Sequence, residues 1–405
     1  MKQLVVNIDQ GDLHARLALF HERNGNLEQA ESHVQRALQK DGKNAIARLA
    51  QGRLRRRQGR LPEAAKVLRA LAEELGGSNP LSASIHFDLA EVCDRLGEYR
   101  QALSNWIRAN TLQANHPDNQ EVNKNAFLVQ IERQRRHDYT RLKLPKPDQH
   151  SKSPIFLVGF PRSGTTLLHH MLADHPEIFV MEEIPIIHRI ARDLGNAQGG
   201  YPSALDKLNT QECRNLRDRY FREVMEHQEV EREKQLVDKL PLSMIHVPLL
   251  KLLFPDCKIV LLLRHPCDCV FSNFAQQYTL NDAMANFSNL DDAANAYYSV
   301  FDLWNHYSEQ FAFDYHALKY EELVTDVDTV QRRLLDYLDL PWPGSVLQHQ
   351  VAAQDKFIRT PSYHDVRQSL YTRSIGRWRN YQKLLDWPPG KLTPFIEQFG
   401  YDKAG

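Results

Sequence analysis

The residues best suited to do chemistry follow a short apolar run, in the segment Phe156–Leu168, FLVGFPRSGTTLL. Gly159 and Gly164 have the spacing of the two glycines in the phosphate-binding loop G-x-x-x-x-G-K-[ST]. A loop of this kind after a buried strand directs backbone N–H groups and the positive end of a helix toward an anion. Thr165 stands where that loop has its lysine, and the cation is Arg162 instead. The segment predicts an anion site that is poorly suited to the β- and γ-phosphates of ATP.

A second cation ends another apolar run. Residues 258–263, KIVLLL, are followed by Arg264, and Ser272 lies eight positions further on, within an expected helix. A planar guanidinium can bind two phosphate oxygens at once, and a hydroxyl adds one more donor. Arg264 and Ser272 together predict a second phosphate contact.

A third segment, residues 361–381, is basic and aromatic and ends in SIGRWRNY. Aromatic rings and guanidinium groups stack on bases, and arginine also binds phosphate. This composition favours a nucleotide contact, although a solvated basic turn with Trp378 in the core is the alternative.

These segments need a scaffold that brings them together. Apolar runs at residues 154–159, 258–263 and 311–318 alternate with helical patterns, which predicts an α/β domain with a parallel sheet flanked by helices. Ligands of such sheets bind outside the carboxyl ends of the strands. The candidate residues fall at those ends.

The N-terminal part has a different pattern, in which helical segments are separated by glycine turns. Each of three glycines is followed five residues later by an alanine: Gly25 and Ala30, Gly59 and Ala64, Gly97 and Ala102. The glycine turns the chain and the alanine lets two helices approach. Over about residues 11–112 this pattern resembles the tetratricopeptide repeat, and an unrelated helical bundle is the alternative.

The sequence predicts three parts along the chain. Residues 1–140 form an all-α repeat domain, in which a helix within residues 119–139 caps the stack. Residues 141–153 are polar and rich in proline and form a linker. Residues 154–405 form the α/β domain.

Composition excludes several classes of partner. The chain has 51 Lys and Arg against 51 Asp and Glu, so no net charge draws it to nucleic acid or to a membrane surface. No apolar run is long enough for a membrane span, and the N-terminus lacks the pattern of a secretory signal. Five cysteines without a CxxC pair argue against a disulfide framework or a zinc site. We therefore expect a cytoplasmic protein with reduced thiols.

The loop FPRSGTT resembles the 5′-phosphosulfate-binding loop of sulfotransferases that use 3′-phosphoadenosine 5′-phosphosulfate (PAPS) as co-substrate. The resemblance covers about residues 154–385. In that family an arginine at a strand end and a serine eight residues later bind the 3′-phosphate. The resemblance implies these nucleotide-binding residues: Arg162, Ser163, Gly164, Thr165, Thr166, Arg264, Ser272, Tyr320, Ser362 and Arg377.

Within the sulfotransferases, the chain resembles the tyrosylprotein sulfotransferases. There a Glu in a G-E-E segment is the general base, which implies Glu183, although Met181 replaces the glycine. The family's catalytic cations imply Arg162 and Lys239, the lysine of its K-x-P segment. No metal is implied. A free glutamate is a weak base, with a pKa near 4.3, so four histidines stay open as alternatives: His169, His170, His246 and His265.

The resemblance implies transfer of a sulfuryl group to a hydroxyl, with protein tyrosine as the first choice. A small phenol, a carbohydrate or a lipid stays open as acceptor, and so does a non-catalytic repeat scaffold. An NTPase of the same fold requires a lysine at Thr165 and a carboxylate where Arg264 stands. The repeats offer a surface for a peptide, a scaffold or a second copy of the chain in a homodimer. The basic run within residues 53–60 forms either a groove for acidic peptides or, by composition, a solvated face.

Overall fold

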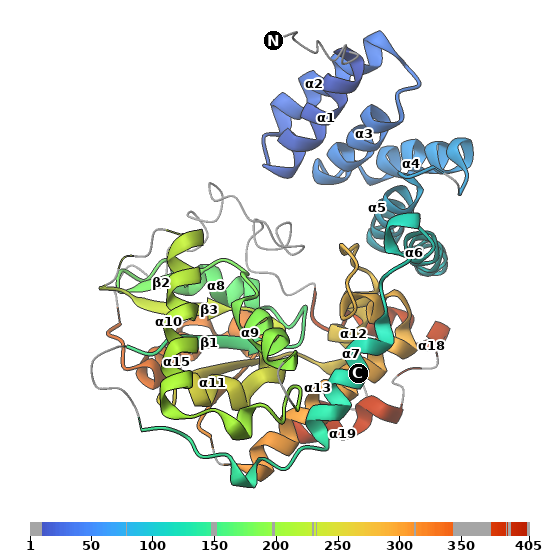
Figure 1. Ribbon diagram of the computed structural model, residues 1–405. Coiled ribbons are helices and arrows are strands. Elements are labelled where there is room, and N and C mark those ends of the chain that lie inside the picture. Colours follow the sequence, from blue (N-terminus) through green and yellow to red (C-terminus); the bar gives the residue numbers. More distant parts are fainter. Residues whose placement is uncertain are drawn as a thin grey trace, which may run out of the picture. The chain divides into compact units, whose positions relative to one another are not determined.

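The structure is a computed structural model (Figure 1). It describes residues 10–77, 79–146, 152–196, 199–228, 231, 233–311, 313–342, 374–385, 387 and 390–402. The chain forms two compact units. The first comprises Met1–Asn123, Phe274–Leu290 and Lys383–Leu385, and the second comprises the remainder.

The first unit is built from helix pairs. Its helices are α1 Gln10–Arg23, α2 Leu27–Lys40, α3 Ala45–Arg57, α4 Leu61–Leu75, α5 Ser82–Arg95 and α6 Tyr99–Ala114. Gly25, Gly59 and Gly97 connect the two helices of each pair with φ angles of 81°, 75° and 78°. Only glycine adopts this left-handed conformation without strain. The predicted pattern of helix, glycine turn and helix is therefore confirmed three times.

Small residues let the paired helices approach closely. Ala30, Ala64 and Ala102 have 0–1% of their surface exposed. Within α3 a side chain at Gly52 would meet Leu68 of α4, since an added Cβ would lie 2.6 Å from the leucine side chain. Close packing of this kind explains why the repeat pattern consists of glycine and alanine rather than of large apolar residues alone.

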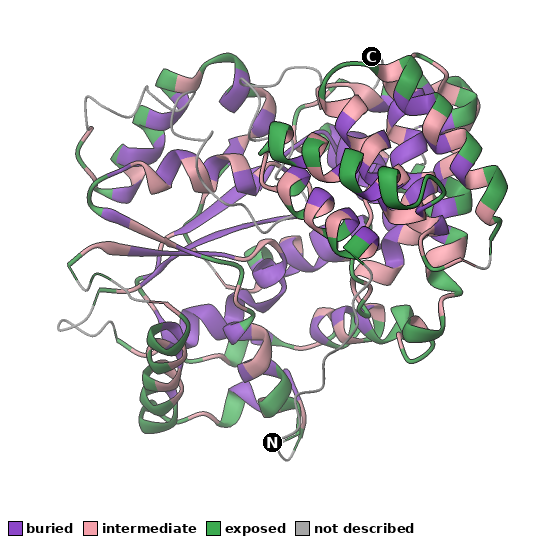
Figure 2. Ribbon diagram, turned by 90° about the horizontal axis from the view of Figure 1, so that it is seen from above, coloured by how far each residue is buried: buried purple, intermediate pink, exposed green. Residues whose placement is uncertain are grey.

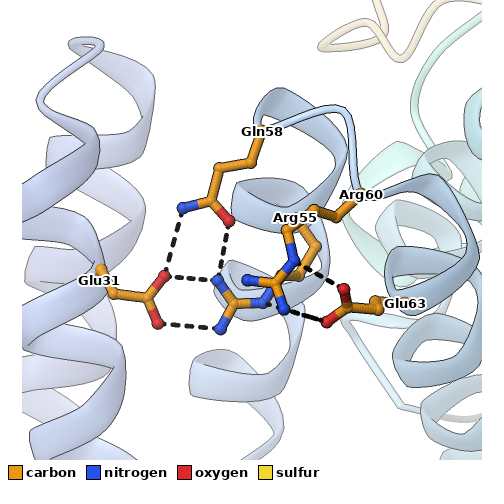
Figure 3. Close-up of polar contacts among 5 residues, drawn as sticks. All are labelled: Glu31, Arg55, Gln58, Arg60 and Glu63. Atoms are coloured by element: carbon orange, nitrogen blue, oxygen red, sulfur yellow. Dashed lines mark hydrogen bonds and ion pairs between the residues drawn. The ribbon is translucent and has the colours of Figure 1, made fainter.

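The basic run on α3 is used for contacts between repeats. Arg55 forms a bidentate ion pair with Glu31 of α2, with N–O distances of 2.5 and 2.9 Å. The side chain of Gln58 forms hydrogen bonds with both residues (Figure 3). The other arginines of the run on α3 pair as follows: Arg57 with Glu22 of α1, and Arg53 and Arg56 with Asp88 of α5. The part of the run on α3 is therefore neither a basic groove nor a solvated face, because carboxylates of neighbouring repeats neutralise it.

The first unit also contains a segment from far along the chain. Asn110 of α6 donates to the carbonyl oxygen of Phe274 at 2.9 Å, and Gln277 donates to Ser84 of α5, also at 2.9 Å. A 3₁₀ helix, η5 Met284–Ser288, lies in the same segment. The sequence analysis missed this insertion, because it carries no repeat pattern of its own.

The second unit contains a five-stranded sheet. Its strands are β1 Ile155–Gly159, β2 Ile178–Met181, β3 Gln235–Lys239, β4 Ile259–Leu263 and β5 His316–Lys319. The order is β2-β3-β1-β4-β5 and all four pairings are parallel. This confirms the predicted α/β class. β1 and β4 are buried at every position, as Figure 2 also shows for the inner strands.

Helices cover both faces of this sheet. Leu157 of β1 and Val260 of β4 belong to a buried cluster with residues of α8 Thr165–Ala173 and α15 Val327–Leu338. On the other face Phe156 contacts Tyr220 of α10 and Phe254, which follows α11. The other helices of the unit are α7 Lys124–Arg135, α9 Ile186–Gly195, α10 Thr210–His227, α11 Val247–Leu253, α12 Pro266–Phe274, α13 Leu290–Gln310, α14 Tyr320–Thr325 and α19 Thr393–Gln398. Among the described helices, none combines the length and the apolar character needed to cross a membrane.

The helix that the sequence predicted as a cap of the repeats is α7, and it belongs to the second unit. Its Arg135 pairs with Asp302 of α13 at 2.8 Å, and Tyr307 of α13 donates to Gln134 at 3.0 Å. These polar contacts attach α7 to α13, which explains why it is not part of the repeat unit. The linker predicted at residues 141–153 stays a prediction.

Candidate active site

Each strand of the sheet ends at, or within three residues before, a residue that the sequence analysis singled out. The loop with Arg162 follows β1, Glu183 follows β2, Lys239 ends β3, Arg264 follows β4 and Tyr320 follows β5. Because the strands are parallel, their carboxyl ends lie at one edge of the sheet. Ligands of open α/β sheets bind at this edge.

The loop after β1 is tightly packed. A Cβ at Gly159 would lie 2.6 Å from the carbonyl oxygen of Leu262, and a side chain at Gly164 would overlap the ring of Tyr320. Gly164 has a φ of 101° and precedes α8, which begins at Thr165. The two glycines thus let the loop run close to β4 and α14, so that the N-terminus of α8 opens at the sheet edge.

The two arginine-bearing turns are joined directly. Arg264 donates from Nη1 to the carbonyl oxygen of Arg162 at 3.0 Å, and Arg162 donates from Nε to Ser272 Oγ at 3.0 Å. The guanidinium of Arg264 also lies 5.0 Å from the centre of the Tyr320 ring. Arg162 has a φ of 67°, which is uncommon for a residue with a side chain. Such backbone strain is typical of functional loops.

Two buried donors at this edge fit an anionic ligand. Ser163 is 1% exposed and Arg264 is 6% exposed, and neither Ser163 Oγ nor Arg264 Nε has a hydrogen-bond partner among the described residues. Burial disfavours the charge of Arg264, but Asp268 and other nearby groups outweigh this and raise its pKa. A buried donor without a partner is costly, and the oxygen atoms of a phosphorylated ligand are acceptors suited to such donors.

Glu183 and Lys239 form an ion pair. The lysine side chain is 2% exposed and the glutamate side chain 33%. The carboxylate therefore remains accessible from solvent, whereas the ammonium group is held inside. The pair places a carboxylate able to accept a proton beside a cation able to stabilise negative charge.

A chain of hydrogen bonds joins residues that follow β2 to a residue that follows β3. Tyr201 OH bonds to His246 Nδ1 at 2.9 Å, and His246 Nε2 bonds to His188 Nδ1 at 3.1 Å. Burial lowers the pKa of His188 to about 4 and that of His246 well below its ordinary value. These histidines are neutral near pH 7. His246 is fully buried and bonded on both ring nitrogens, which favours a structural role over that of a base.

The other histidine candidates also have structural contacts. His265 stacks on Trp378 with ring centres 5.1 Å apart, and burial lowers its pKa. His169 and His170 of α8 contact each other edge to face. None of these arrangements resembles the carboxylate and ammonium pair of Glu183 and Lys239.

The remaining residues predicted to bind the nucleotide lie in three different places along the chain. Thr165 and Thr166 are buried in the first turn of α8. The guanidinium of Arg377 lies 5.8 Å from the ring centre of Phe271, the residue before Ser272. Ser362 lies outside the described residues.

Two residues of this region escaped the sequence analysis. Asn273 donates to the carbonyl oxygen of Pro161 at 2.8 Å, and Asp268 accepts hydrogen bonds from Gly376 and Trp378. A signal existed for Asp268, because it lies four residues before Ser272 on the same helix, α12. Residues at this spacing share one side of a helix.

A large open concavity of the second unit lies elsewhere. It has a volume of about 810 Å³ and is lined by residues of α7 and α13 and the segment between α7 and β1. Its arginines are paired with its own carboxylates, Arg135 with Asp302 and Arg136 with Glu132. We therefore place the candidate site at the strand ends, where unpartnered donors gather. Among the described residues no group of three His, Cys, Asp or Glu side chains is arranged to hold a metal ion.

Two parts of the chain are similar to known protein families. Residues 154–344 match the Sulfotransferase family, and residues 15–79 match the Tetratricopeptide repeat. A protein of Aquifex aeolicus (strain VF5), named only as uncharacterized, is 28% identical over 360 residues, 84% of this chain and 44% of that protein. Protein-tyrosine sulfotransferase A of Caenorhabditis elegans is 28% identical over 61% of this chain and 67% of its own length. Protein-tyrosine sulfotransferase 1 of Homo sapiens is 30% identical over 48% of this chain and 54% of its own length.

The match therefore spans less than half of the Aquifex protein and about half to two thirds of the two tyrosine sulfotransferases. Among solved structures, the sulfotransferase domain from the curacin biosynthetic pathway is 21% identical with a TM-score of 0.44, covering 62% of this chain and 98% of that one. This chain contains a domain of the sulfotransferase family, preceded in the sequence by tetratricopeptide repeats.

Proposed function

We propose that this protein transfers a sulfuryl group from PAPS to the hydroxyl group of an acceptor. The observation that carries the proposal is the hydrogen bond from Arg264 to the carbonyl oxygen of Arg162. It joins the loop after β1 to the end of β4 and leaves two buried donors, Ser163 Oγ and Arg264 Nε, without partners among the described residues. A nucleotide with phosphates on both its 5′ and its 3′ side fits two adjoining anion sites.

The chemistry assigned to this edge is an in-line displacement at sulfur. The acceptor oxygen forms a bond to sulfur as the bond from sulfur to the 5′-phosphate oxygen breaks. Glu183 takes the proton of the acceptor hydroxyl, and Arg162 and Lys239 stabilise the negative charge that develops on the departing phosphate. Positioning and electrostatics carry most of such a transfer, by analogy with phosphoryl transfer. The products are 3′,5′-ADP and a sulfated acceptor.

For the acceptor we propose a tyrosine hydroxyl of a protein. Two arguments support this choice. Relatives at 28–30% identity are named protein-tyrosine sulfotransferases, and tetratricopeptide repeats commonly bind other proteins. The acidic-peptide groove that the sequence suggested on α3 does not support it, because those arginines are paired with carboxylates of neighbouring repeats. A small phenol, a carbohydrate or a lipid is the alternative acceptor.

Calorimetric titration of the full chain with 3′,5′-ADP and with ATP tests the nucleotide assignment. We expect tight binding of 3′,5′-ADP, much weaker binding of ATP, and no change on addition of EDTA. An NTPase of the same fold would instead prefer ATP with magnesium, and a repeat scaffold without an active domain would bind neither nucleotide. Either result would overturn the proposal.

Transfer of labelled sulfate tests the acceptor. The full chain is incubated with PAPS that carries labelled sulfur and with a cell lysate, and the labelled products are separated. We expect label in protein that is recovered as tyrosine sulfate after hydrolysis. Label confined to small molecules, glycans or lipids would retain the transferase and reject the tyrosine acceptor.

A further inference from the structure

A buried aspartate connects α12 to the segment that contains Arg377. Asp268, in the first turn of α12, is 1% exposed. Its two carboxylate oxygens accept hydrogen bonds from the backbone N–H of Gly376 at 2.6 Å and of Trp378 at 3.1 Å. These two amides flank Arg377 on either side. One carboxylate thus fixes the backbone on both sides of the arginine.

Neighbouring residues hold the same short segment. Arg264 donates from Nη2 to the carbonyl oxygen of Ser374 at 2.5 Å. The ring of His265 stacks on that of Trp378 at an angle of 18°, and Trp378 is fully buried. The end of β4 and the start of α12 therefore bind residues 374–378 through their side chains.

The side chain of this arginine lies against α12. Arg377 is half-buried, and its guanidinium lies over the ring of Phe271 on α12. The next residue of α12, Ser272, accepts the hydrogen bond from Arg162. Asp268, Phe271 and Ser272 thus connect Arg377 to the two arginine-bearing turns described above.

Burial of a carboxylate is expensive unless hydrogen bonds compensate it. Hydrogen bonds from backbone N–H groups to a carboxylate are among the strong ones in proteins. The carboxylate of Asp268 can therefore accept a hydrogen bond from each of the two amides, whereas a neutral side chain of the same shape cannot. Asparagine would keep one acceptor oxygen but would turn an N–H₂ group toward the second amide.

We propose that Asp268 is a positioning residue, which fixes Arg377 in the orientation that binds the donor nucleotide. The inference rests on the function proposed above, because it assumes a bound 3′,5′-phosphorylated adenosine. It goes beyond that function in assigning a role to a residue that does not itself contact the nucleotide.

A double-mutant cycle in the full chain tests this role. The affinity for 3′,5′-ADP is measured by calorimetry for the wild type, for Asp268→Asn, for Arg377→Ala and for the combination. We expect each single variant to bind about tenfold more weakly, as for the loss of a charged hydrogen bond. The double variant should bind 3′,5′-ADP no more weakly than the single variant with the lower affinity, because both changes remove the same contact. In turnover assays Asp268→Asn should raise KM for PAPS with little change in kcat.

Asp328→Asn is the matched control, since Asp328 lies in the first turn of α15 and is exposed. It should bind 3′,5′-ADP as the wild type does. If Asp268 had a merely structural role, Asp268→Asn would lower the melting temperature and leave KM for PAPS unchanged. The losses of affinity for 3′,5′-ADP in the two single variants would then be additive.

The outcomes separate the inference from the proposed function. If the wild type does not bind 3′,5′-ADP, both fail. If the wild type binds and the two losses are additive, or Asp268→Asn binds as tightly as the wild type, the inference alone is overturned. Arg377→Ala keeps the test open should Asp268→Asn not fold, because wild-type affinity in Arg377→Ala would by itself contradict a nucleotide contact there.

Discussion

Lys239, the last residue of β3, forms an ion pair with Glu183, which lies two residues beyond the end of β2. The register of the sheet explains this contact. Met181 is paired with Asp238 in the parallel β2–β3 ladder, so the chain segments that follow the two strands continue side by side. In the mechanism proposed above, an acceptor hydroxyl bonded to Glu183 would therefore come within reach of the lysine charge, so that proton removal and charge stabilisation would act at one place.

The first prediction concerns the base. Glu183→Gln keeps the size of the side chain and can still accept a hydrogen bond from Lys239, but it cannot take a proton. We expect the variant to bind 3′,5′-ADP as tightly as the wild type and to lose turnover by about 100-fold or more, the usual contribution of a general base. Calorimetry and a sulfate-transfer assay measure the two quantities.

Glu182→Gln is the control for this experiment, because Glu182 is the adjacent exposed carboxylate. It should retain both binding and turnover. Full turnover in Glu183→Gln would show that the base is another group, and an equal loss in Glu182→Gln would point to a general electrostatic effect of the segment.

The second prediction concerns Arg264. Removal of its side chain by Arg264→Ala should weaken binding of 3′,5′-ADP by about 1.5–3 kcal/mol, typical of a hydrogen bond to a charged group. Binding of 5′-AMP, which lacks the 3′-phosphate, should change little. The two affinities are compared by calorimetry, with Arg333→Ala on α15 as a control arginine that is 54% exposed and paired with Glu322.

The comparison with 5′-AMP is needed because Arg264 also bonds to the carbonyl oxygens of Arg162 and Ser374. If its main task is to hold these turns, both nucleotides should lose the same affinity. An equal loss would reject the assignment of Arg264 to the 3′-phosphate.

Much of the scaffold could be predicted from local patterns. The repeat helices are marked by glycine turns and alanines at fixed spacing, and β1 and β4 are continuous apolar runs that are buried at every position. β2 and β3 gave no such signal. β2 has only four residues, and β3 carries Gln235, Asp238 and Lys239 although it lies inside the sheet. Polar side chains within a buried strand make it resemble a loop in sequence.

The site was predictable in its parts but not in its contacts. Each candidate was found because it follows an apolar run or matches a family motif. Glu183 and Lys239 are 56 residues apart, and their ion pair depends on the pairing of β2 with β3, which no local pattern reports. The same holds for Asp268, whose partners lie 108 and 110 residues away. The basic run on α3 was misread for this reason too, because its carboxylate partners come from other repeats.

The third prediction uses Asp238, a buried carboxylate beside Lys239. It is 2% exposed and accepts a hydrogen bond from Tyr220 at 2.8 Å. Burial raises the pKa of Asp238 to about 7 from its ordinary value of 3.8, although Tyr220 and Lys239 oppose the shift. Between these two values the folded chain binds more protons than the unfolded chain. The free energy of unfolding that Asp238 contributes therefore falls as the pH rises from about 4 to about 7.

Asp238→Asn removes this dependence, since the amide is neutral at every pH. We expect the variant to be more stable than the wild type above pH 7, by on the order of a few kcal/mol, and the difference to shrink toward pH 4. Melting temperatures of both proteins at pH 4.5, 6.0 and 7.5 measure it, with Asp336→Asn on the exposed face of α15 as control. A stability difference that is constant across these pH values would contradict the raised pKa of Asp238.

The fourth prediction concerns the contact between Arg55 and Glu31, which joins α3 to α2 (Figure 3). Their side chains are 14% and 23% exposed, and two parallel hydrogen bonds fix their geometry. A double-mutant cycle with Arg55→Ala and Glu31→Ala should give a coupling energy of about 1 kcal/mol, at the upper end for ion pairs near the surface. Hydrogen exchange of backbone amides in α2 and α3 of the full chain reports this stability locally.

Arg60 and Glu63 provide a control in the same region, in which the single variant Glu63→Ala also reports the longer contact of Glu63 with Arg55 at 4.0 Å. They form an equally short pair, but both lie at the start of α4 and are 48% and 51% exposed. Solvent screens such a pair and no second repeat is held by it, so its coupling energy should be close to zero. If the two cycles gave the same small value, Arg55 would not couple the repeats, and the basic run of α3 would have to be regarded as a solvated surface after all.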